Sequence, residues 1–395
     1  MPAAAPSERS SCVLHRDDDD TVITIDAGGT SQVPSRSTRV TRAQQSLVDD
    51  VYKKWKDTYL QKTPQGLLVQ YNLAHDSEPK NAVTTSESIG YGMLISVLMG
   101  EQEDFSGLLD FYRNFVNPQF GLMKWQVLDN GNGHLEPSSI HSATDGDMDV
   151  AYALFKAEKT WPGKGYKETA KGICKALLTH CIKAGESHMP MTGDDAGPND
   201  YNRLISRSSD WMPAHFKLFE QEDADNAGQW KATFEKTNAA YQRNLDQHPT
   251  GLLADFYMYD ESHKVYNAAT GRVHEKETDG SYWFNACRVP WRLAAYWKSY
   301  GKHAVEQSGL MPTMEALQKF FEKEVLSHGQ VYGGYDLYGN RLNDWTSNSF
   351  LAPAWCLLKV MGSSKADDLE QKVREHLHDR YYADSILLLS MLETQ

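Results

Sequence analysis

The sequence lacks the marks of several protein classes. Its five cysteines are an odd number without a Cys-x-x-Cys pair, which argues against a disulfide framework and a cysteine zinc site. Its 14 histidines form no His-x-x-x-His pair with an acidic partner, and no Walker-type glycine loop occurs. No apolar run is long enough to span a bilayer. We therefore expect no metal, no cofactor and no membrane segment.

Positive charge is also scarce. The chain has 40 Lys and Arg against 53 Asp and Glu, a formal net charge of -13. Nucleic acid and anionic membrane surfaces are therefore poor partners, whereas a cationic polymer would be attracted. Ordinary solubility explains an acidic surface equally well. Aromatic residues are abundant, with 20 Tyr, 13 Phe and 10 Trp, and they suit either a sugar-binding surface or a well-packed core.

The composition divides the chain into two parts. Residues 1–40 are rich in Ser, Pro, Arg and Asp and predict a disordered leader without the apolar core of a secretory signal. Residues 41–395 contain no Pro/Ser linker and predict a single domain. Apolar residues recur there at the 3.6-residue spacing of a helix in about twelve segments, which predicts an all-α fold with few, short strands. Long loops, expected to lack regular structure and to be functional, lie at 117–142, 189–210, 257–284 and 329–347.

The stretch from Thr84 to Gly100, TTSESIGYGMLISVLMG, places an acid where an apolar helix begins. Ser86 is expected to cap this helix, and Glu87 follows in its first turn. Gly90 and Gly92 are expected to leave room for a substrate beside the acid. Glu87 is therefore placed for proton transfer, although a first-turn acid can also serve only to favour the helix dipole.

A second stretch, ATDGDMDVAYALFKAEKTW at 143–161, carries three alternating acids, Asp145, Asp147 and Asp149. It begins like a calcium-binding loop but lacks the Gly and Glu that such a loop needs at its sixth and twelfth positions. The apolar spacing instead predicts a buried helix directly after the acids. Asp145 should then face the same cleft as Glu87, and Asp147 or Asp149 could cap the helix.

These two stretches resemble the acid-bearing segment and the signature helix of glycoside hydrolase family 8. FNACRVPWRL (284–293) and YYADSILLLSML (381–392) are similar to further family segments, and the likeness runs from about residue 45 to the C-terminus. The resemblance implies an (α/α)6 toroid of six inner and six outer helices, in agreement with the independent count of about twelve. It also implies inverting hydrolysis of a glycosidic bond, in which one carboxyl protonates the leaving oxygen and another activates water.

The resemblance assigns roles to several residues. It implies that Glu87 is the general acid and that Asp145 holds the sugar at the cleavage point. Burial should then raise the pKa of Glu87. Arg288 matches a family arginine beside that point, although a salt bridge at the edge of the core would explain it as well. Trp125 and Trp211 are candidates for stacking on sugar rings, although tryptophan is often a core residue.

The position of the catalytic base departs from many members of the family. Asn285 stands where they carry Asp, and a neutral amide does not usefully take a proton from water. One branch with Asn here, which includes chitosanases and mixed-linkage glucanases, takes its base from a Glu in the preceding loop. That loop reads GRVHEKETDGSYWFN, and Glu275, ten residues before Asn285, fits that branch best. Glu277 is the next candidate, and Asp279 is the third acid of the loop.

Three functions follow from these observations. The first is an inverting endo-hydrolase of β-1,4-linked polysaccharide, foremost chitosan, whose ammonium groups suit an acidic cleft. The second is a β-glucanase acting on mixed-linkage glucan or cellulose. The third is a catalytically silent oligosaccharide-binding toroid that lost its base at Asn285. We expect a monomer whose partner is a polysaccharide. Such a substrate implies secretion, but the leader is not a recognisable signal.

Overall fold

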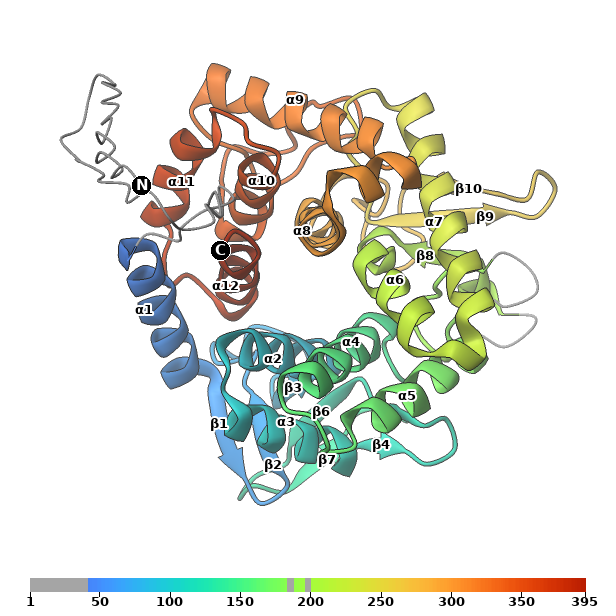
Figure 1. The fold of residues 1–395 in the computed structure, drawn as a ribbon, viewed down its shortest axis with the longest axis vertical. Coiled ribbons are helices and arrows are strands. Elements are labelled where there is room, and N and C mark those ends of the chain that lie inside the picture. The colour runs from blue at the N-terminus through green and yellow to red at the C-terminus, as the bar shows by residue number, and fades with distance from the viewer. Residues whose placement is uncertain (1–41, 183–187, 196–199) are drawn as a thin grey trace, which may run out of the picture. The chain divides into compact units, whose positions relative to one another are not determined.

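A computed structural model describes residues 42–182, 188–195 and 200–395, so the leader predicted at 1–40 lies outside the described residues. Helices dominate the described part of the chain (Figure 1). They number twelve there, as predicted. Their bounds are α1 Arg42–Tyr59, α2 Ser86–Met99, α3 Gln102–Asn114, α4 Thr144–Thr160, α5 Tyr166–His180, α6 Pro213–Glu222, α7 Ala227–Gln247, α8 Val289–Ser308, α9 Met311–His328, α10 Asn348–Val360, α11 Ala366–Glu375 and α12 Tyr381–Glu393.

Alternate helices form a closed inner ring. Each of α2, α4, α6, α8, α10 and α12 contacts the next, and α12 returns to α2, while the remaining six helices lie outside them (Figure 1). This is the predicted (α/α)6 arrangement. Its cause is visible in the sequence, because α2 is apolar or small on every side and almost wholly buried, whereas the outer helix α11 is apolar along one stripe only. Even so, none of the described helices combines the length and apolarity needed to cross a membrane.

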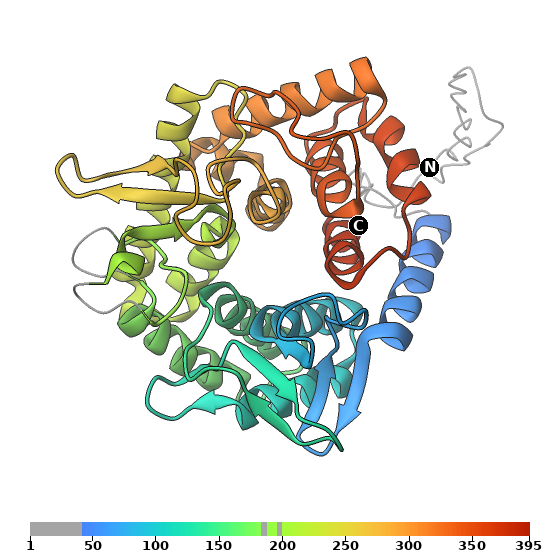
Figure 2. The same ribbon diagram turned by 180° about the vertical axis from the view of Figure 1, so that it is seen from behind.

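Short antiparallel strands precede or join the helices, and in Figure 2 they lie in front of the ring together with the long loops. They form the sheets β1–β2, β3–β6–β7, β4–β5 and β8–β9–β10. Their bounds are β1 Leu60–Thr63, β2 Gly66–Val69, β3 Ala82–Thr85, β4 Val116–Asn117, β5 Leu122–Met123, β6 Gln126–Asp129, β7 Leu135–Pro137, β8 Ile205–Arg207, β9 Phe256–Asp260 and β10 Val265–Ala268.

These strands correct one prediction. The loops 117–142, 189–210 and 257–284 were expected to lack regular structure, but the first contains β5 to β7, the second contains β8, and the third contains most of the β9–β10 hairpin. Strands of two to five residues are too short for a period of two to stand out from a loop sequence. Because β3 runs directly into α2, the strand-bearing side of the ring is also the side at which this inner helix begins.

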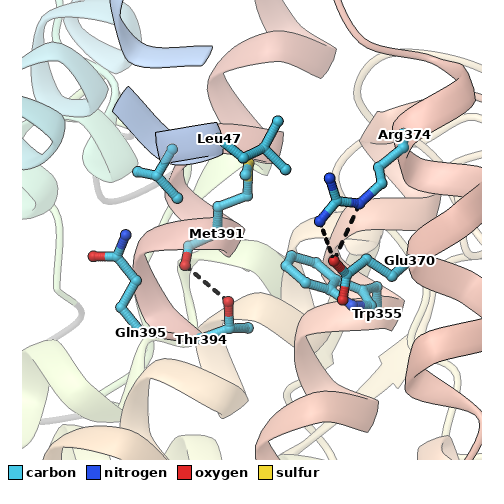
Figure 3. A pocket seen from close by; sticks show the side chains of 8 residues that line it. Leu47, Trp355, Glu370, Arg374, Met391, Thr394 and Gln395 are labelled. Atoms are coloured by element: carbon cyan, nitrogen blue, oxygen red, sulfur yellow. Dashed lines mark hydrogen bonds and ion pairs between the residues drawn. The ribbon is translucent and has the colours of Figure 1, made fainter. Parts of the chain in front are cut away.

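The first and last helices of the described chain, α1 and α12, contact each other. Leu47 of α1, Trp355 of α10, and Met391 and Thr394 at the end of α12 surround a small cavity, beside which Arg374 donates to Glu370 at 2.6 Å (Figure 3). The cavity holds about 30 Å³, the space of one or two water molecules. It is too small for a sugar ring, so it is not the cleft predicted from the sequence.

Candidate active site

Two inner helices begin side by side and bring the two predicted acids together. Glu87 lies in the first turn of α2, and Asp145 lies in the first turn of α4. The approach is so close that a Cβ on Gly146 would lie 2.6 Å from the backbone nitrogen of Glu87. Gly90 also faces α4, and Gly92 lies against core side chains. The prediction that these two glycines make room for substrate is therefore wrong, because they make room for protein packing.

The cap of α2 is Thr85 rather than the predicted Ser86. The Ser88 N–H donates to Thr85 Oγ1 at 3.2 Å, and the Thr85 N–H donates to Ser88 Oγ at 2.9 Å, which is a reciprocal capping box. The Ser86 N–H donates instead to the carbonyl oxygen of Trp125 at 2.8 Å. The backbone of Trp125 is thereby tied to the start of the acid-bearing helix, and its side chain is 37% exposed.

Arg288 joins the two acids. Its side chain is 1% exposed, and Nη1 donates to Glu87 Oε2 at 2.7 Å and to Asp145 Oδ2 at 3.0 Å. A second cation, Arg207, lies 2.9 Å from the other oxygen of Asp145. The two interpretations of Arg288, a site residue or a salt-bridge residue, therefore coincide, because its ion-pair partners are the two acids of the site.

The two acids have opposite pKa shifts. Burial raises the pKa of Glu87 to about 7, and although Arg288 lowers it, the negative charge of Asp145 adds to the rise. Burial also disfavours ionised Asp145, but Arg207 and Arg288 outweigh it and hold the pKa of Asp145 below its ordinary value. The predicted rise for Glu87 is confirmed. In mildly acidic solution one carboxyl holds a proton while its neighbour stays charged, as a proton donor beside a fixed anion requires.

Asn285 connects this pair to the acid predicted as the base. Its Nδ2 donates to Glu275 Oε2 at 3.2 Å and to Asp255 Oδ2 at 3.3 Å, while its Oδ1 accepts from Arg288 Nη2 at 2.9 Å. Glu275 is exposed, so its carboxylate is open to water. A hydrogen-bonded chain thus runs from Glu275 through Asn285 and Arg288 to Glu87. Asp255 was not among the residues predicted for the site. It is 3% exposed, and burial raises the pKa of its carboxyl to about 7.

The other two acids of the Glu275 loop are placed differently. Glu277 is exposed, and its carboxylate lies back toward Gly271 of the same loop. Asp279 is 1% exposed, and its carboxylate accepts four backbone N–H groups of the loop. Of the three candidates, Glu275 is the one that contacts Asn285.

Trp211 does not lie in the cleft. It has no exposed surface, its Nε1 donates to Ser206 Oγ at 2.8 Å, and its ring meets the ring of Tyr241 edge to face at 5.5 Å. The prediction that Trp211 stacks on a sugar is wrong, because core side chains cover the whole ring. Its position after a long loop reflects anchoring of that loop to the core.

The two further acids of α4 bind side chains of neighbouring helices, and neither caps the helix. Asp147 accepts from Tyr112 Oη at 2.5 Å, and Asp149 accepts from Arg292 at 2.7 Å and from His215 at 2.7 Å. These contacts join α4 to α3, α6 and α8. Across 42–182, 188–195 and 200–395, no group of three or more His, Cys, Asp or Glu is arranged to hold a metal ion.

Comparisons with known proteins bear on this site. A sequence model described as glycosyl hydrolases family 8 matches residues 31–395. A β-glucanase of Niallia circulans is 29% identical over 365 residues, which cover 89% of this chain and 84% of that protein. An endoglucanase of Bacillus sp. (strain KSM-330) is 27% identical over 376 residues, covering 89% and 76%. The apo structure of a β-1,3-1,4-glucanase from Paenibacillus sp. X4 has a TM-score of 0.77 at 28% identity, covering 89% of this chain and 92% of that one.

Proposed function

The chain belongs to glycosyl hydrolases family 8, and we propose that it is an inverting endo-hydrolase of β-glucan. The family predicted from the four motifs is thereby confirmed. The observation that carries the proposed activity is the hydrogen-bonded chain that links Glu87, through Arg288 and Asn285, to the exposed carboxylate of Glu275. It supplies an acid and a base in a family whose chemistry needs both.

In the proposed reaction, Glu87 gives its proton to the glycosidic oxygen as the bond to the anomeric carbon breaks. Glu275 accepts a proton from the water that attacks that carbon from the opposite face, so the product has inverted configuration. Asp145, held ionised by Arg207 and Arg288, holds the sugar at the cleavage point and stabilises positive charge that develops on it. Solvent then returns a proton to Glu87 and removes one from Glu275.

Glucan is the favoured substrate, ahead of chitosan, which was the first candidate from the sequence. The relatives named above as β-glucanase, endoglucanase and β-1,3-1,4-glucanase support this order. Chitosan remains the second candidate because the net charge is -13, whereas the contact of Glu275 with Asn285 fits a branch that includes both chitosanases and mixed-linkage glucanases. The silent-binder hypothesis loses support, since an exposed acid stands beside Asn285.

Reducing-end release from mixed-linkage β-glucan and from soluble chitosan, measured side by side with Glu87→Gln as the blank, tests the proposal. We expect release from glucan, an α-anomeric first product in the proton NMR spectrum, and no release by Glu87→Gln. Release from chitosan alone would mean that chitosan, rather than glucan, is the substrate. A β-anomeric product would contradict inversion, and no release from either polymer would restore the silent binder.

A further inference from the structure

One buried carboxylate shapes the loop that carries Glu275. Asp279 Oδ2 accepts the N–H of Val273 at 3.0 Å, of His274 at 2.7 Å and of Glu275 at 3.0 Å, and its Oδ1 accepts the N–H of Lys276 at 2.8 Å. Four consecutive backbone donors therefore converge on one anion. Hydrogen bonds to an ionised acceptor are about twice as strong as neutral ones, so this cluster fixes the backbone on both sides of Glu275.

Asp279 is itself fixed to the body of the protein. Its carbonyl oxygen accepts the N–H of Phe256, the first residue of β9, at 2.9 Å. A Cβ on the next residue, Gly280, would collide with the carbonyl oxygen of Ala269, so the chain passes there in close contact with the end of β10. Asp279 thus connects a strand of the β8–β9–β10 sheet to the segment that holds Glu275.

Glu275 needs such a support. Its side chain is exposed, and its carboxylate meets the protein at Asn285 Nδ2, 3.2 Å away. A glutamate side chain with many accessible rotamers loses conformational entropy when it is held in one orientation. A misplacement of about 1 Å at a reacting group can cost about 10²-fold in rate. The backbone of the loop must therefore supply most of the positional order.

We propose that Asp279 is the positioning residue of the catalytic base: its carboxylate gathers four backbone N–H groups and thereby holds Glu275 against Asn285. The proposal rests on the proposed function, in which Glu275 is the base. Asp279 touches no substrate, being 1% exposed, so its effect must pass through Glu275.

Asp279→Asn tests this, because the amide keeps the shape but loses the charge and one acceptor oxygen. On the polysaccharide that the wild type cleaves, we expect kcat to fall about 10- to 100-fold while KM stays within about twofold. Asp260→Asn is the matched control, since Asp260 also accepts two backbone N–H groups, of Ser262 and His263, but in the β9–β10 turn. It should keep wild-type kcat and KM. If Asp279→Asn does not fold, Asp279→Ser, which retains one acceptor, replaces it.

A double-mutant cycle separates positioning from a general loss of structure. Asp279→Asn in a Glu275→Gln background should be no slower than Glu275→Gln alone, because the side chain being positioned is already inactive. A further multiplicative loss in the double variant, or a wild-type rate for Asp279→Asn beside an inactive Glu275→Gln, would overturn the positioning role alone. A wild-type rate for Glu275→Gln would overturn the base assignment and the positioning role with it.

Discussion

At the scale of single residues, the proposed general acid Glu87 should set an alkaline limit to activity. Burial raises its pKa to about 7, and a general acid works only while protonated. As far as Glu87 alone decides it, we expect kcat/KM to be constant below that pH and to fall about tenfold per pH unit above it. Initial rates from about pH 4 to about pH 10 measure the limb. An alkaline limb near the pKa of an unperturbed glutamate would contradict the assignment.

Asp145→Asn serves as the internal check on this limb. The negative charge of Asp145 raises the pKa of Glu87, and its loss also leaves Arg288 freer to stabilise ionised Glu87. Both effects act in one direction, so the alkaline limb of the residual activity should move to lower pH. A limb that moves to higher pH would show that another group titrates.

The residues that sequence could identify are those inside contiguous motifs. Glu87 stands in the first turn of its helix, as predicted. The helix predicted directly after the three acids instead begins at Thr144, so Asp145 lies in its first turn rather than before it. Arg207 and Asp255 were missed because each reaches the site by folding over a long loop, and nothing in their own neighbourhoods marks them. Trp211 was misassigned for a related reason, since the local sequence does not encode which side of a loop end faces the core.

At the scale of elements, the close approach of α2 and α4 is a condition for the site. A Cβ on Gly146 would collide with the Ser86 carbonyl carbon and lie 2.6 Å from the Glu87 nitrogen, both backbone atoms. Gly146→Ala must therefore push the helices apart. We expect the free energy of unfolding to fall by about 1–3 kcal/mol. We also expect kcat/KM to fall about 10²-fold, because Glu87 moves relative to Asp145.

Gly172→Ala is the matched control for that prediction. Gly172 is exposed on the outer helix α5, where an added Cβ meets nothing within 4 Å. Alanine in a helix interior should stabilise by about 0.5–1 kcal/mol and leave the rate unchanged. Urea unfolding and kcat/KM are measured for both variants. Equal effects of the two substitutions would mean that the packing of α2 on α4 does not position the acids.

Helices could be predicted because their apolar spacing persists over ten or more residues, as in α1 and α5. The cap of α2 was misplaced by one residue, since Thr85 and Ser86 are both good caps by type and the backbone geometry decides between them. The short strands β5 to β7 were missed because they are only two to four residues long, and because β6 is also held by pairing with the distant strand β3, which no local pattern shows.

At the scale of the whole molecule, the count of helices together with the motif resemblance was enough to predict the (α/α)6 ring. Closing that ring requires contacts between α12 and α2, which are almost 300 residues apart and are not visible in any local pattern. Substrate preference is a property of the same scale, because it depends on the summed field of the charges and on the shape of a cleft assembled from several loops.

The dependence of KM on ionic strength tests the effect of these charges on substrate preference. With a net charge of -13, the protein should attract cationic chitosan, repel anionic carboxymethyl-cellulose and be indifferent to neutral mixed-linkage glucan. Salt at about 1 M shortens the screening length to about 3 Å, so it should raise KM for chitosan, lower it for carboxymethyl-cellulose and leave it within about twofold for mixed-linkage glucan.

The three polymers, measured at low and high salt, control for each other. If the glucan KM changes as much as the other two, salt acts on the protein itself rather than on the encounter. If the polymers behave as expected but chitosan at high salt is still cleaved faster than glucan, the preference for chitosan resides in the cleft, and the proposed order of substrates is reversed.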